Sequence, residues 1–363
     1  MRNSEWDFAF RALQGSGQRR KCMKIVNIRA VQPETPGSPP DWRTWLGQIL
    51  VRVDTDEGLT GYGVGGGGPA GIHVVQTALK SLLVGKDPTA VETIWERMYR
   101  ATLAYGQKGL ALMAISGVDL ALWDLRGQRA GKPLAEMLGG QVGQPIPCYK
   151  TGGSLEDISA VQGAGFGAVK LQVGKLDAAG AIEQIRQARE AVGPGIRIMT
   201  DAFMSWDVDT ALRVAEGLQP YDVGWLEEPL PIDDLDGYER LKQDSPVPIA
   251  GGEHEYTAAA FEMWMQRGLH AVVQPDVCWC GGLTELVKIY RMAAQYGVNV
   301  CPHRGSEVWA LHAIAALSPD PLAESGRPWI TWVGGQPEIQ DGTIRLGSGA
   351  GFGVTFDERL WRV

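Results

Sequence analysis

Apolar and polar residues alternate in two segments near the start of the chain. In KIVNIRAVQ (24–32) and GQILVRVDTDEGLTGYGVG (47–65), apolar side chains recur largely at every second position. Successive side chains of a strand point to opposite faces, so this pattern predicts antiparallel strands with one face against a core. The sequence DEGLTG (56–61) is typical of a hairpin turn between two of them.

Residues 74–140 place apolar side chains at intervals of three and four, which predicts helices. Their last stretch, LMAISGVDLALWDLRGQRAGKPLAEMLGG (112–140), stops at a glycine pair, a common signal for the end of a helix. Before them, GGGGPAG (65–71) lacks the Gly-Lys-Ser/Thr ending of a phosphate-binding loop. We therefore expect a flexible turn there.

The pattern changes near residue 145, where short apolar runs alternate with amphipathic helical stretches. Strands separated by helices form parallel sheets, and at this length a closed barrel is the economical arrangement. The sequence predicts an α/β fold with seven such strands: IPCYKTGG, AVKLQV, IRIMTDA, VGWLEEP, PIAGGE, AVVQPDV and NVCPH.

These patterns divide the chain into three parts. Residues 1–22 show no sustained pattern, and we expect a disordered extension. Residues 23–144 form a first α+β domain, which the hairpin-like segment 335–363 completes. Residues 145–334 form the barrel.

Composition excludes two classes of partner. The net charge is −8 and no basic block stands out, which argues against nucleic acid. No apolar run approaches the roughly 20 residues that span a bilayer, so no membrane is expected. Five cysteines without a CxxC pair indicate reduced thiols in a cytoplasmic protein.

Three acidic residues end consecutive predicted strands, about one strand–helix unit apart: Asp201, Glu227 and Glu253. The carboxyl ends of barrel strands converge at one mouth, where active sites form. A single acid at such a position commonly caps a helix, but three in register would repel one another strongly. A hard divalent cation relieves that repulsion, and carboxylate oxygens suit Mg²⁺.

Asp276 and His303 end the next two predicted strands. A carboxylate that holds one imidazole nitrogen fixes the tautomer of the ring and raises its basicity, so this pair suits a general base. His254 follows Glu253 directly, so we expect it near the mouth, with its ring pointing either into the mouth or away from it. For the other three histidines we expect packing or surface roles.

The stretch GFGAVKLQVGK (165–175) places Lys170 and Gln172 two residues apart. In a strand both point to the same side. Taken alone, this spacing is typical of a solvated strand end. Beside the acidic strand ends, it predicts that both side chains face the mouth.

The chain from Met23 onward resembles the enolase superfamily, in the mandelate racemase subgroup. GVDLALWDLRGQRAGKPLAEMLGG, WLEEPL and QPDVCWCGGLTE carry the resemblance. DAFMSWDVDTA and GGEHEYT are most similar to L-rhamnonate dehydratases and related acid-sugar dehydratases. The resemblance implies an α+β capping domain over a (β/α)7β TIM-like barrel. It further implies one Mg²⁺ per subunit on Asp201, Glu227 and Glu253, a His303–Asp276 dyad, and Glu324 near the substrate carboxylate.

The chain departs from the family at one position. The family often carries K-x-K on the second barrel strand, and its second lysine is a base; this chain has Gln172 there. An amide cannot accept a proton at neutral pH. With Lys170 as a donor and His303 as the one base, the chemistry is dehydration of a sugar acid to a 2-keto-3-deoxy acid. A racemase or epimerase using His254 or Lys170 as second base, and a non-catalytic sugar-acid binding protein, remain alternatives.

The expected partner is a small-molecule sugar acid, resembling L-rhamnonate, and the protein is expected to be a homo-oligomer. Specificity should lie in the capping loops DWRTW (41–45) and 63–73. Candidate substrate-binding residues are Gln172, Trp206 and Arg43, although a solvated surface role is the alternative for Arg43.

Overall fold

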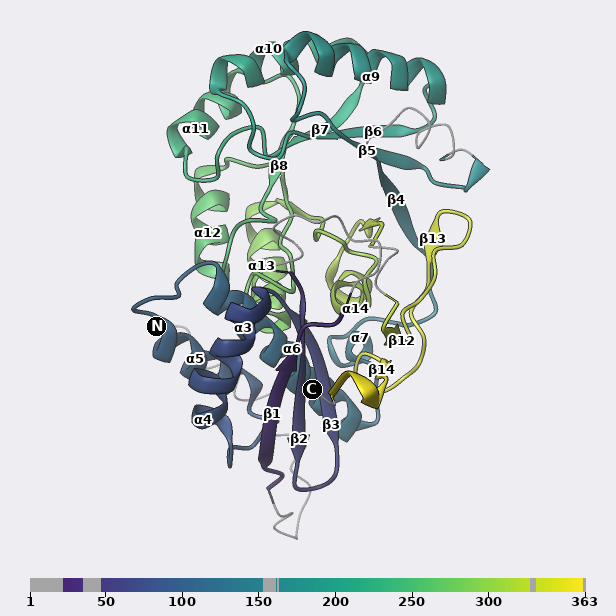
Figure 1. The fold of residues 1–363 in the computed structure, drawn as a ribbon. Helices are drawn as coiled ribbons and strands as arrows, with labels where there is room; N and C mark the ends of the chain where they lie inside the picture. Colours follow the sequence, from purple (N-terminus) through teal and green to yellow (C-terminus); the bar gives the residue numbers. More distant parts are fainter. Residues whose placement is uncertain (1–21, 35–46, 153–160, 162, 327–330, 362–363) are drawn as a thin grey trace.

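The computed structural model describes residues 22–34, 47–152, 161, 163–326 and 331–361 (Figure 1). The expected extension at 1–22 therefore lies outside the described residues except for Cys22. All five cysteines are free thiols. Within the described residues, no helix is both long and apolar enough to cross a membrane.

The first part of the chain forms a three-stranded antiparallel sheet, as predicted. Strands β1 (Ile25–Val31), β2 (Ile49–Thr55) and β3 (Thr60–Gly65) pair in that order. The turn between β2 and β3 is the predicted hairpin, closed by a hydrogen bond from Thr55 N to Leu59 O at 3.0 Å.

Helices cover this sheet, but two of the predicted signals differ in the structure. The glycine run is not a flexible turn: Gly66, Gly67 and Gly68 are buried, and a helix already begins at Gly68. The long helix ends at Ala130, where Gly131 adopts φ 63°, rather than at the later glycine pair. The helical elements are α3 (Gly68–Val74), the π-helical turn η1 (Val75–Leu79), α4 (Lys80–Leu83), α5 (Val91–Thr102), α6 (Leu110–Ala130) and α7 (Leu134–Met137).

Alternate glycines on β3 explain why α6 lies directly on the sheet. A Cβ atom at Gly61 or Gly63 would lie 2.1 Å from a backbone oxygen of α6, and one at Gly65 would lie 2.3 Å from another. These glycines therefore allow a backbone-to-backbone approach that no side chain permits. Helix α6 is apolar on nearly all sides, which suits an element enclosed between the sheet and the second half of the molecule.

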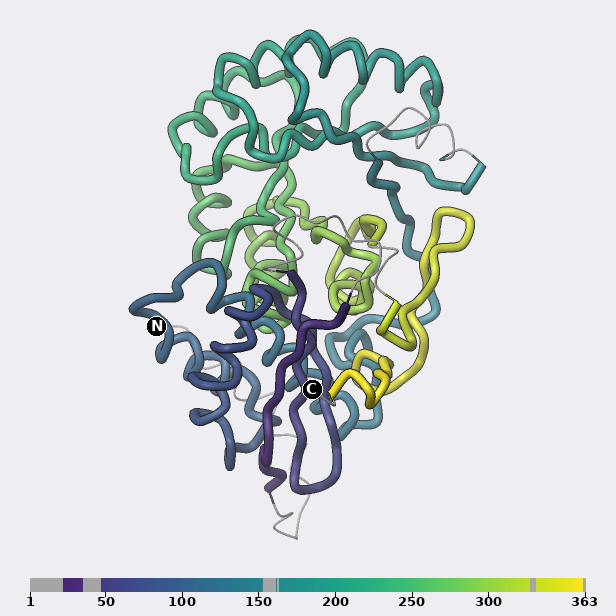
Figure 2. Tube along the Cα trace, in the orientation of Figure 1, coloured from purple at the N-terminus to yellow at the C-terminus, as the bar shows by residue number. Residues whose placement is uncertain are grey.

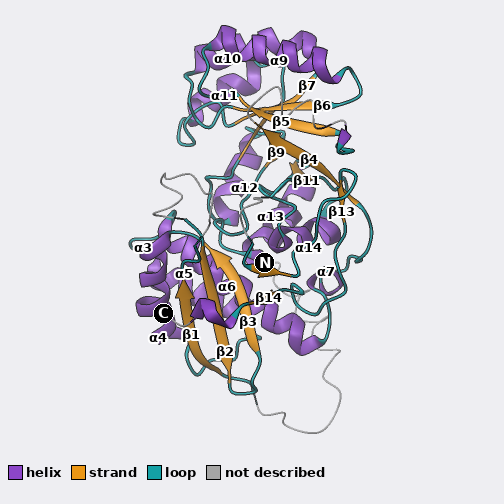
Figure 3. Ribbon diagram, turned by 45° about the vertical axis from the view of Figure 1, so that its right-hand side comes forward, coloured by secondary structure: helices purple, strands orange, loops and turns teal. Residues whose placement is uncertain are grey.

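The second half is a curled parallel sheet with helices on its outer face (Figure 3). From β5 to β10 each strand is followed by a helix before the next strand, the arrangement that the sequence predicted. The strands are β4 (Ile146–Gly152), β5 (Ala168–Gln172), β6 (Arg197–Asp201), β7 (Val223–Glu227), β8 (Ile249–Gly251), β9 (Val272–Val273), β10 (Asn299–Val300) and β11 (Ala323–Glu324). The helices are α9 (Ala178–Val192), α10 (Val208–Leu218), η2 (Gln219–Tyr221), α11 (Leu235–Asp244), α12 (Ala258–Arg267), α13 (Leu283–Tyr296) and α14 (Val308–Leu317).

The eighth strand, β11, was not among the seven runs identified in the sequence, because only two residues form it. It pairs with β4, and within the described residues no strand ladder joins it to β10. The two ends of the sheet meet through loop contacts instead. Ser306 N donates to Glu324 O at 2.9 Å, and Cys301 Sγ lies 3.7 Å from Leu322 O. The α/β prediction holds, with a curled sheet in place of a fully laddered barrel.

Buried polar residues of α6 join the two halves. Asp119 accepts the N–H of Thr284 at 2.9 Å and its hydroxyl at 2.6 Å, at the start of α13. Ser116 Oγ accepts the N–H of Gly281 at 2.9 Å. Side chains of α6 therefore satisfy backbone donors at the start of α13 that helix geometry leaves unpaired.

The end of the chain returns to the first half, as Figure 2 shows. Phe352 N donates to the buried Asp124 at 3.0 Å, and Arg52 Nη1 lies 2.7 Å from Glu358 Oε2. The division into domains at residues 22, 144 and 334 remains a prediction. The elements here are β12 (Val333–Gly334), β13 (Thr343–Ile344), β14 (Thr355–Phe356) and η3 (Glu358–Trp361).

The close approach of β3 to α6 makes a testable prediction. Gly63→Ala should lower the free energy of unfolding by about 3 kcal/mol, because its new methyl group would meet the backbone oxygen of Gly117. Gly195→Ala is the matched control, since nothing lies within 4 Å of its Cβ position, and it should change stability by no more than about 0.5 kcal/mol. Urea denaturation measures both, and equal values would contradict the packing argument.

Candidate active site

The carboxyl ends of the parallel strands bring the predicted acids together. Asp201 and Glu227 are the last residues of β6 and β7 and are partners in register. Gln172 ends β5 and pairs with Asp201 in the same way. The other predicted residues lie just beyond their strands: Glu253 follows β8, and His303 follows β10. Strand register therefore sets one part of the site, and loops set the rest.

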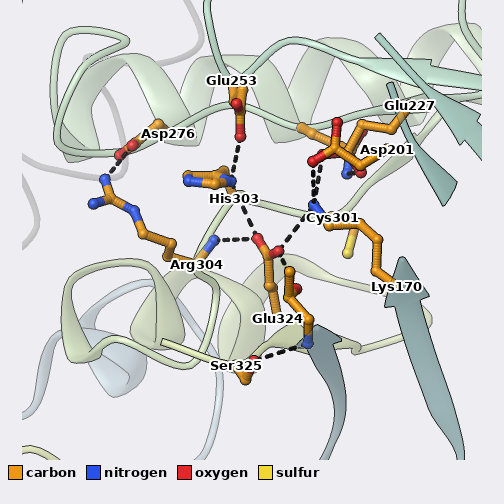
Figure 4. A network of polar contacts seen from close by, with 12 residues as sticks. Lys170, Asp201, Glu227, Glu253, Asp276, Cys301, His303, Arg304, Glu324 and Ser325 are labelled. Atoms are coloured by element: carbon orange, nitrogen blue, oxygen red, sulfur yellow. Dashed lines mark hydrogen bonds and ion pairs between the residues drawn. The ribbon is translucent and has the colours of Figure 1, made fainter. Parts of the chain in front are cut away.

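Lys170 is the centre of a buried polar network (Figure 4). Its Nζ lies 2.6 Å from Glu227 Oε1, 2.9 Å from Glu324 Oε1 and 3.8 Å from Asp201 Oδ2. The lysine is 1% exposed, so water does not screen these pairs. One ammonium thus holds carboxylates from three strands.

Two residues that the sequence did not single out hold Glu227 from the other side. Its Oε2 accepts hydrogen bonds from Trp225 Nε1 at 3.0 Å and from Gln274 Nε2 at 2.6 Å. Trp225 lies two residues before Glu227 on β7, so the period of a strand could have identified it. Gln274 follows β9 and carries no comparable signal.

Glu324 connects Lys170 to the loop that follows β10. Its Oε1 also accepts the hydroxyl of Thr151 at 2.6 Å, and its Oε2 accepts the backbone N–H of Arg304 at 2.7 Å. Its Oε2 lies 3.2 Å from His303 Nδ1. This carboxylate is thus fully engaged, and it fixes the position of His303.

The structure does not form the predicted hydrogen bond between His303 and Asp276. His303 Nδ1 lies 2.6 Å from Glu253 Oε2, while Asp276 pairs with the guanidinium of Arg304 and accepts the N–H of Cys278. The physical reason is that both residues lie beyond their strands, where the loop backbone decides the partner. Arg304 has φ 52° and directs its long side chain to Asp276.

His254 lies beside the network. Its Nδ1 is 2.7 Å from Glu228 Oε2 and 3.5 Å from Glu253 Oε1. Its ring contacts Phe203 edge-on at 5.2 Å between centroids and lies 5.8 Å from Trp279. Phe203 is 43% exposed, so an aromatic side chain at the mouth is open to a ligand.

Burial dominates the electrostatics. It raises the pKa of the Asp201 and Glu227 carboxyls, and repulsion by neighbouring carboxylates adds to the rise although Lys170 opposes it. Burial also opposes ionisation of Glu324, yet Lys170 and His303 hold its pKa well below the usual range. The same carboxylates raise the pKa of Lys170 well above its usual value despite burial. Lys170 is therefore a cation and a donor at neutral pH.

The site has the donors that a divalent cation requires. Glu227, Glu253 and His303 each offer an atom within 4.8 Å of the others, and Asp201 neighbours Glu227 in register. Glu253 Oε2 is buried and has His303 Nδ1 at 2.6 Å as its partner, so this carboxylate and His303 meet at one point of the site. Carboxylate oxygens in this number suit a hard cation such as Mg²⁺.

Backbone strain concentrates at this mouth. Phe203, Met204, Glu228 and Arg304 all have positive φ, between 37° and 58°, although none is glycine. Such conformations persist only where the surroundings enforce them, and they cluster at functional sites. Each strained residue lies one to three positions after Asp201, Glu227 or His303.

The predicted substrate-binding residues differ in their placement. Gln172 is exposed at the end of β5, on the same side as Lys170. Trp206 is a correction: it is buried in the apolar layer outside the sheet, and its Nε1 donates to Leu176 O at 3.2 Å. Trp206 lies beyond the turn that follows β6 and just before α10, where it packs against helices rather than facing the mouth. Arg43 and the loop 41–45 lie outside the described residues.

Comparison with known proteins adds a family to this geometry. Residues 155–360 match the enolase C-terminal domain-like family, and residues 46–139 match the mandelate racemase/muconate lactonizing enzyme N-terminal domain. An L-rhamnonate dehydratase from Saccharopolyspora erythraea is 38% identical over 331 residues, covering 87% of this chain and 84% of that protein.

Two solved structures have the same fold over most of their length. The 3,6-anhydro-D-galactonate cycloisomerase from Zobellia galactanivorans has a TM-score of 0.85 and 30% identity, over 93% of this chain and 98% of that one. The L-talarate dehydratase from Polaromonas sp. JS666, complexed with Mg and L-glucarate, has a TM-score of 0.79 and 29% identity, over 86% and 91%.

The partner of Asp276 can be tested with double-mutant cycles. In chelator-containing buffer, Asp276→Asn and Arg304→Met should show a coupling energy of about 2 kcal/mol, because either change alone leaves a buried charge unpaired. The matched cycle of Asp276→Asn with His303→Asn should give a coupling below about 0.5 kcal/mol. Urea denaturation measures both cycles. A larger coupling to His303 would restore the predicted dyad.

Proposed function

This chain belongs to the enolase superfamily, with both mandelate racemase/muconate lactonizing enzyme domains, and from that premise we propose that it dehydrates a sugar acid with Mg²⁺ as cofactor. The observation that carries the proposal is the buried network in which Lys170 and His303 lie among Asp201, Glu227 and Glu253. The L-rhamnonate dehydratase and L-talarate dehydratase relatives support this class of reaction.

Asp201, Glu227 and Glu253 are the proposed ligands of one Mg²⁺ per subunit. When bound, the ion supplies a Lewis acid that stabilises negative charge on the substrate carboxylate. Gln274 and Trp225 donate to Glu227 and hold it in place. Such supporting contacts orient a ligand and tune its affinity.

His303 is the proposed general base, and it removes the proton from C2 of the substrate. Lys170 and Glu324 lie on the same network, and Lys170 donates to the carboxylate oxygens on which charge develops. The electron pair of the C2–H bond forms the C2–C3 double bond as the C3–O bond breaks. The imidazolium returns its proton to the leaving hydroxyl, so water departs and the enol product tautomerises to a 2-keto-3-deoxy acid.

Asp276 acts on His303 indirectly in this proposal. Asp276 pairs with Arg304, which directly follows His303 in the chain, and Arg304 N donates to Glu324. Asp276 therefore fixes the loop that carries the base. The direct His303–Asp276 contact of the family pattern is the alternative that the double-mutant cycles above decide.

A racemase or epimerase needs a second base on the opposite face of C2. Lys170 does not suit that role, because its Nζ is already engaged by Glu227 Oε1 and Glu324 Oε1. His254, whose Nδ1 lies 2.7 Å from Glu228 Oε2, is the residue that an epimerase would use as its second base. Dehydration needs one base only, and the dehydratase relatives favour it. A binding protein without activity would leave this costly buried network without a use.

A screen tests the proposal directly. Incubation with Mg²⁺ and a panel of sugar acids, including L-rhamnonate, should yield a 2-keto acid that semicarbazide detects. Chelation should abolish the signal and Mg²⁺ should restore it. His303→Asn should lower turnover by about 10²–10⁴-fold while circular dichroism stays unchanged, since the general base is lost. Full activity after exhaustive chelation, or in His303→Asn, would exclude the proposed roles.

Gln172 makes a stereochemical prediction. The amide can hold a substrate hydroxyl but cannot move a proton, so chemistry is confined to the face of His303. In D₂O, recovered substrate should exchange its C2 hydrogen only with retention, as proton NMR and chiral analysis can measure. Gln172→Leu, which removes the hydrogen bond, should raise KM without producing the C2 epimer. Accumulation of that epimer by the wild-type protein at the rate of dehydration would reveal a second base.

A further inference from the structure

Glu255 is a buried carboxylate to which the proposed reaction assigns no role. It follows Glu253 and His254 in the loop after β8, and its side chain is 1% exposed. Its Oε1 accepts the backbone N–H of Tyr256 at 2.8 Å. A carboxylate this deeply buried needs a cation nearby, because the interior solvates its charge poorly.

Lys108 supplies that cation from the other half of the molecule. It lies between α5 and α6, and its Nζ is 2.7 Å from Glu255 Oε1 and 2.8 Å from Oε2. Among the residues that the structure describes, it is the one Lys, Arg or His within ion-pair distance of Glu255. The Lys108 side chain is itself 57% exposed. A surface residue of the capping half, which contains β1–β3 and α3–α7, therefore neutralises a buried charge of the barrel half, which contains β4–β11.

Three consecutive residues of the β8 loop have three separate partners. Glu253 contacts His303, His254 contacts Glu228, and Glu255 contacts Lys108. Neighbouring Cα atoms are only about 3.8 Å apart, so a shift of Glu255 toward water would carry the other two with it. The position of the proposed metal ligand Glu253 therefore depends on the pair at Glu255.

The capping half holds the next loop in a similar way. The indole N–H of Trp95 donates to Gly281 O at 2.7 Å, and Ser116 accepts the N–H of Gly281. Gly281 lies in the loop that follows Asp276. Contacts from the capping half thus reach both loops that follow β8 and β9.

We infer that Lys108 is a positioning residue, whose ion pair with Glu255 fixes the loop that presents Glu253 and His254 and thereby sets the affinity for Mg²⁺. The inference rests on the proposed function for the identity of the metal. It extends the site to a residue of the capping half that touches neither metal nor substrate.

Isothermal titration of the full chain with Mg²⁺ tests the inference without any substrate. Lys108→Met should raise the Kd for Mg²⁺ by about tenfold or more, as loss of a supporting contact does in other metal sites. Lys108→Arg should stay within about threefold of the wild type, because it keeps the charge. Lys86→Met is the matched control, since Lys86 is an exposed lysine of the same half, and it should leave the Kd unchanged.

A double variant separates positioning from general destabilisation. Lys108→Met/Glu255→Gln removes both charges, so it should recover most of the Mg²⁺ affinity that Lys108→Met loses. If the Kd of Lys108→Met stays within about twofold of the wild type, the inference is overturned, because the binding free energy has then changed by less than about 0.5 kcal/mol. The inference is also overturned if Lys108→Arg loses as much Mg²⁺ affinity as Lys108→Met and both losses accompany a fall in Tm. A wild-type protein that binds Mg²⁺ but dehydrates no sugar acid would sink the proposed reaction and leave this inference standing.

Discussion

The buried ammonium of Lys170 is the interaction on which the centre of this molecule depends. It lies within 4 Å of carboxylates from β6, β7 and β11, and burial makes each of those charges costly. One lysine cannot balance Asp201, Glu227, Glu253 and Glu324. Burial raises the pKa of Asp201 and Glu227, and repulsion among the neighbouring carboxylates adds to the rise. A site of this kind sacrifices stability and gains affinity for a cation.

Strands and loops contribute differently to the site. Register between β5, β6 and β7 sets Gln172, Asp201 and Glu227 side by side, and little freedom remains there. Glu253 and His303 lie on loops, where neighbouring residues such as Arg304 adopt strained backbone conformations. The loops need support from outside the barrel to hold such geometry.

The first half of the chain gives that support. Glycines of β3 let α6 approach the sheet closely, and α6 then presents Ser116 and Asp119 to the start of α13. Lys108, just before α6, reaches Glu255 beside the proposed metal ligand. The helix that packs the capping sheet also places the contacts that hold the mouth of the barrel.

The sequence by itself determined the repeating elements and the residues at their ends. Periodicity predicted the antiparallel strands and the alternation of strand and helix, and Asp201, Glu227 and Lys170 followed from strand ends and a period of two. Tertiary structure alone decided the partner of Asp276, the packing of Trp206 in the apolar layer outside the sheet, the burial of the glycine run and the two-residue strand that holds Glu324. The reason is physical: a strand fixes the direction of its side chains through its period, whereas a loop residue takes the partner that the folded backbone brings within reach.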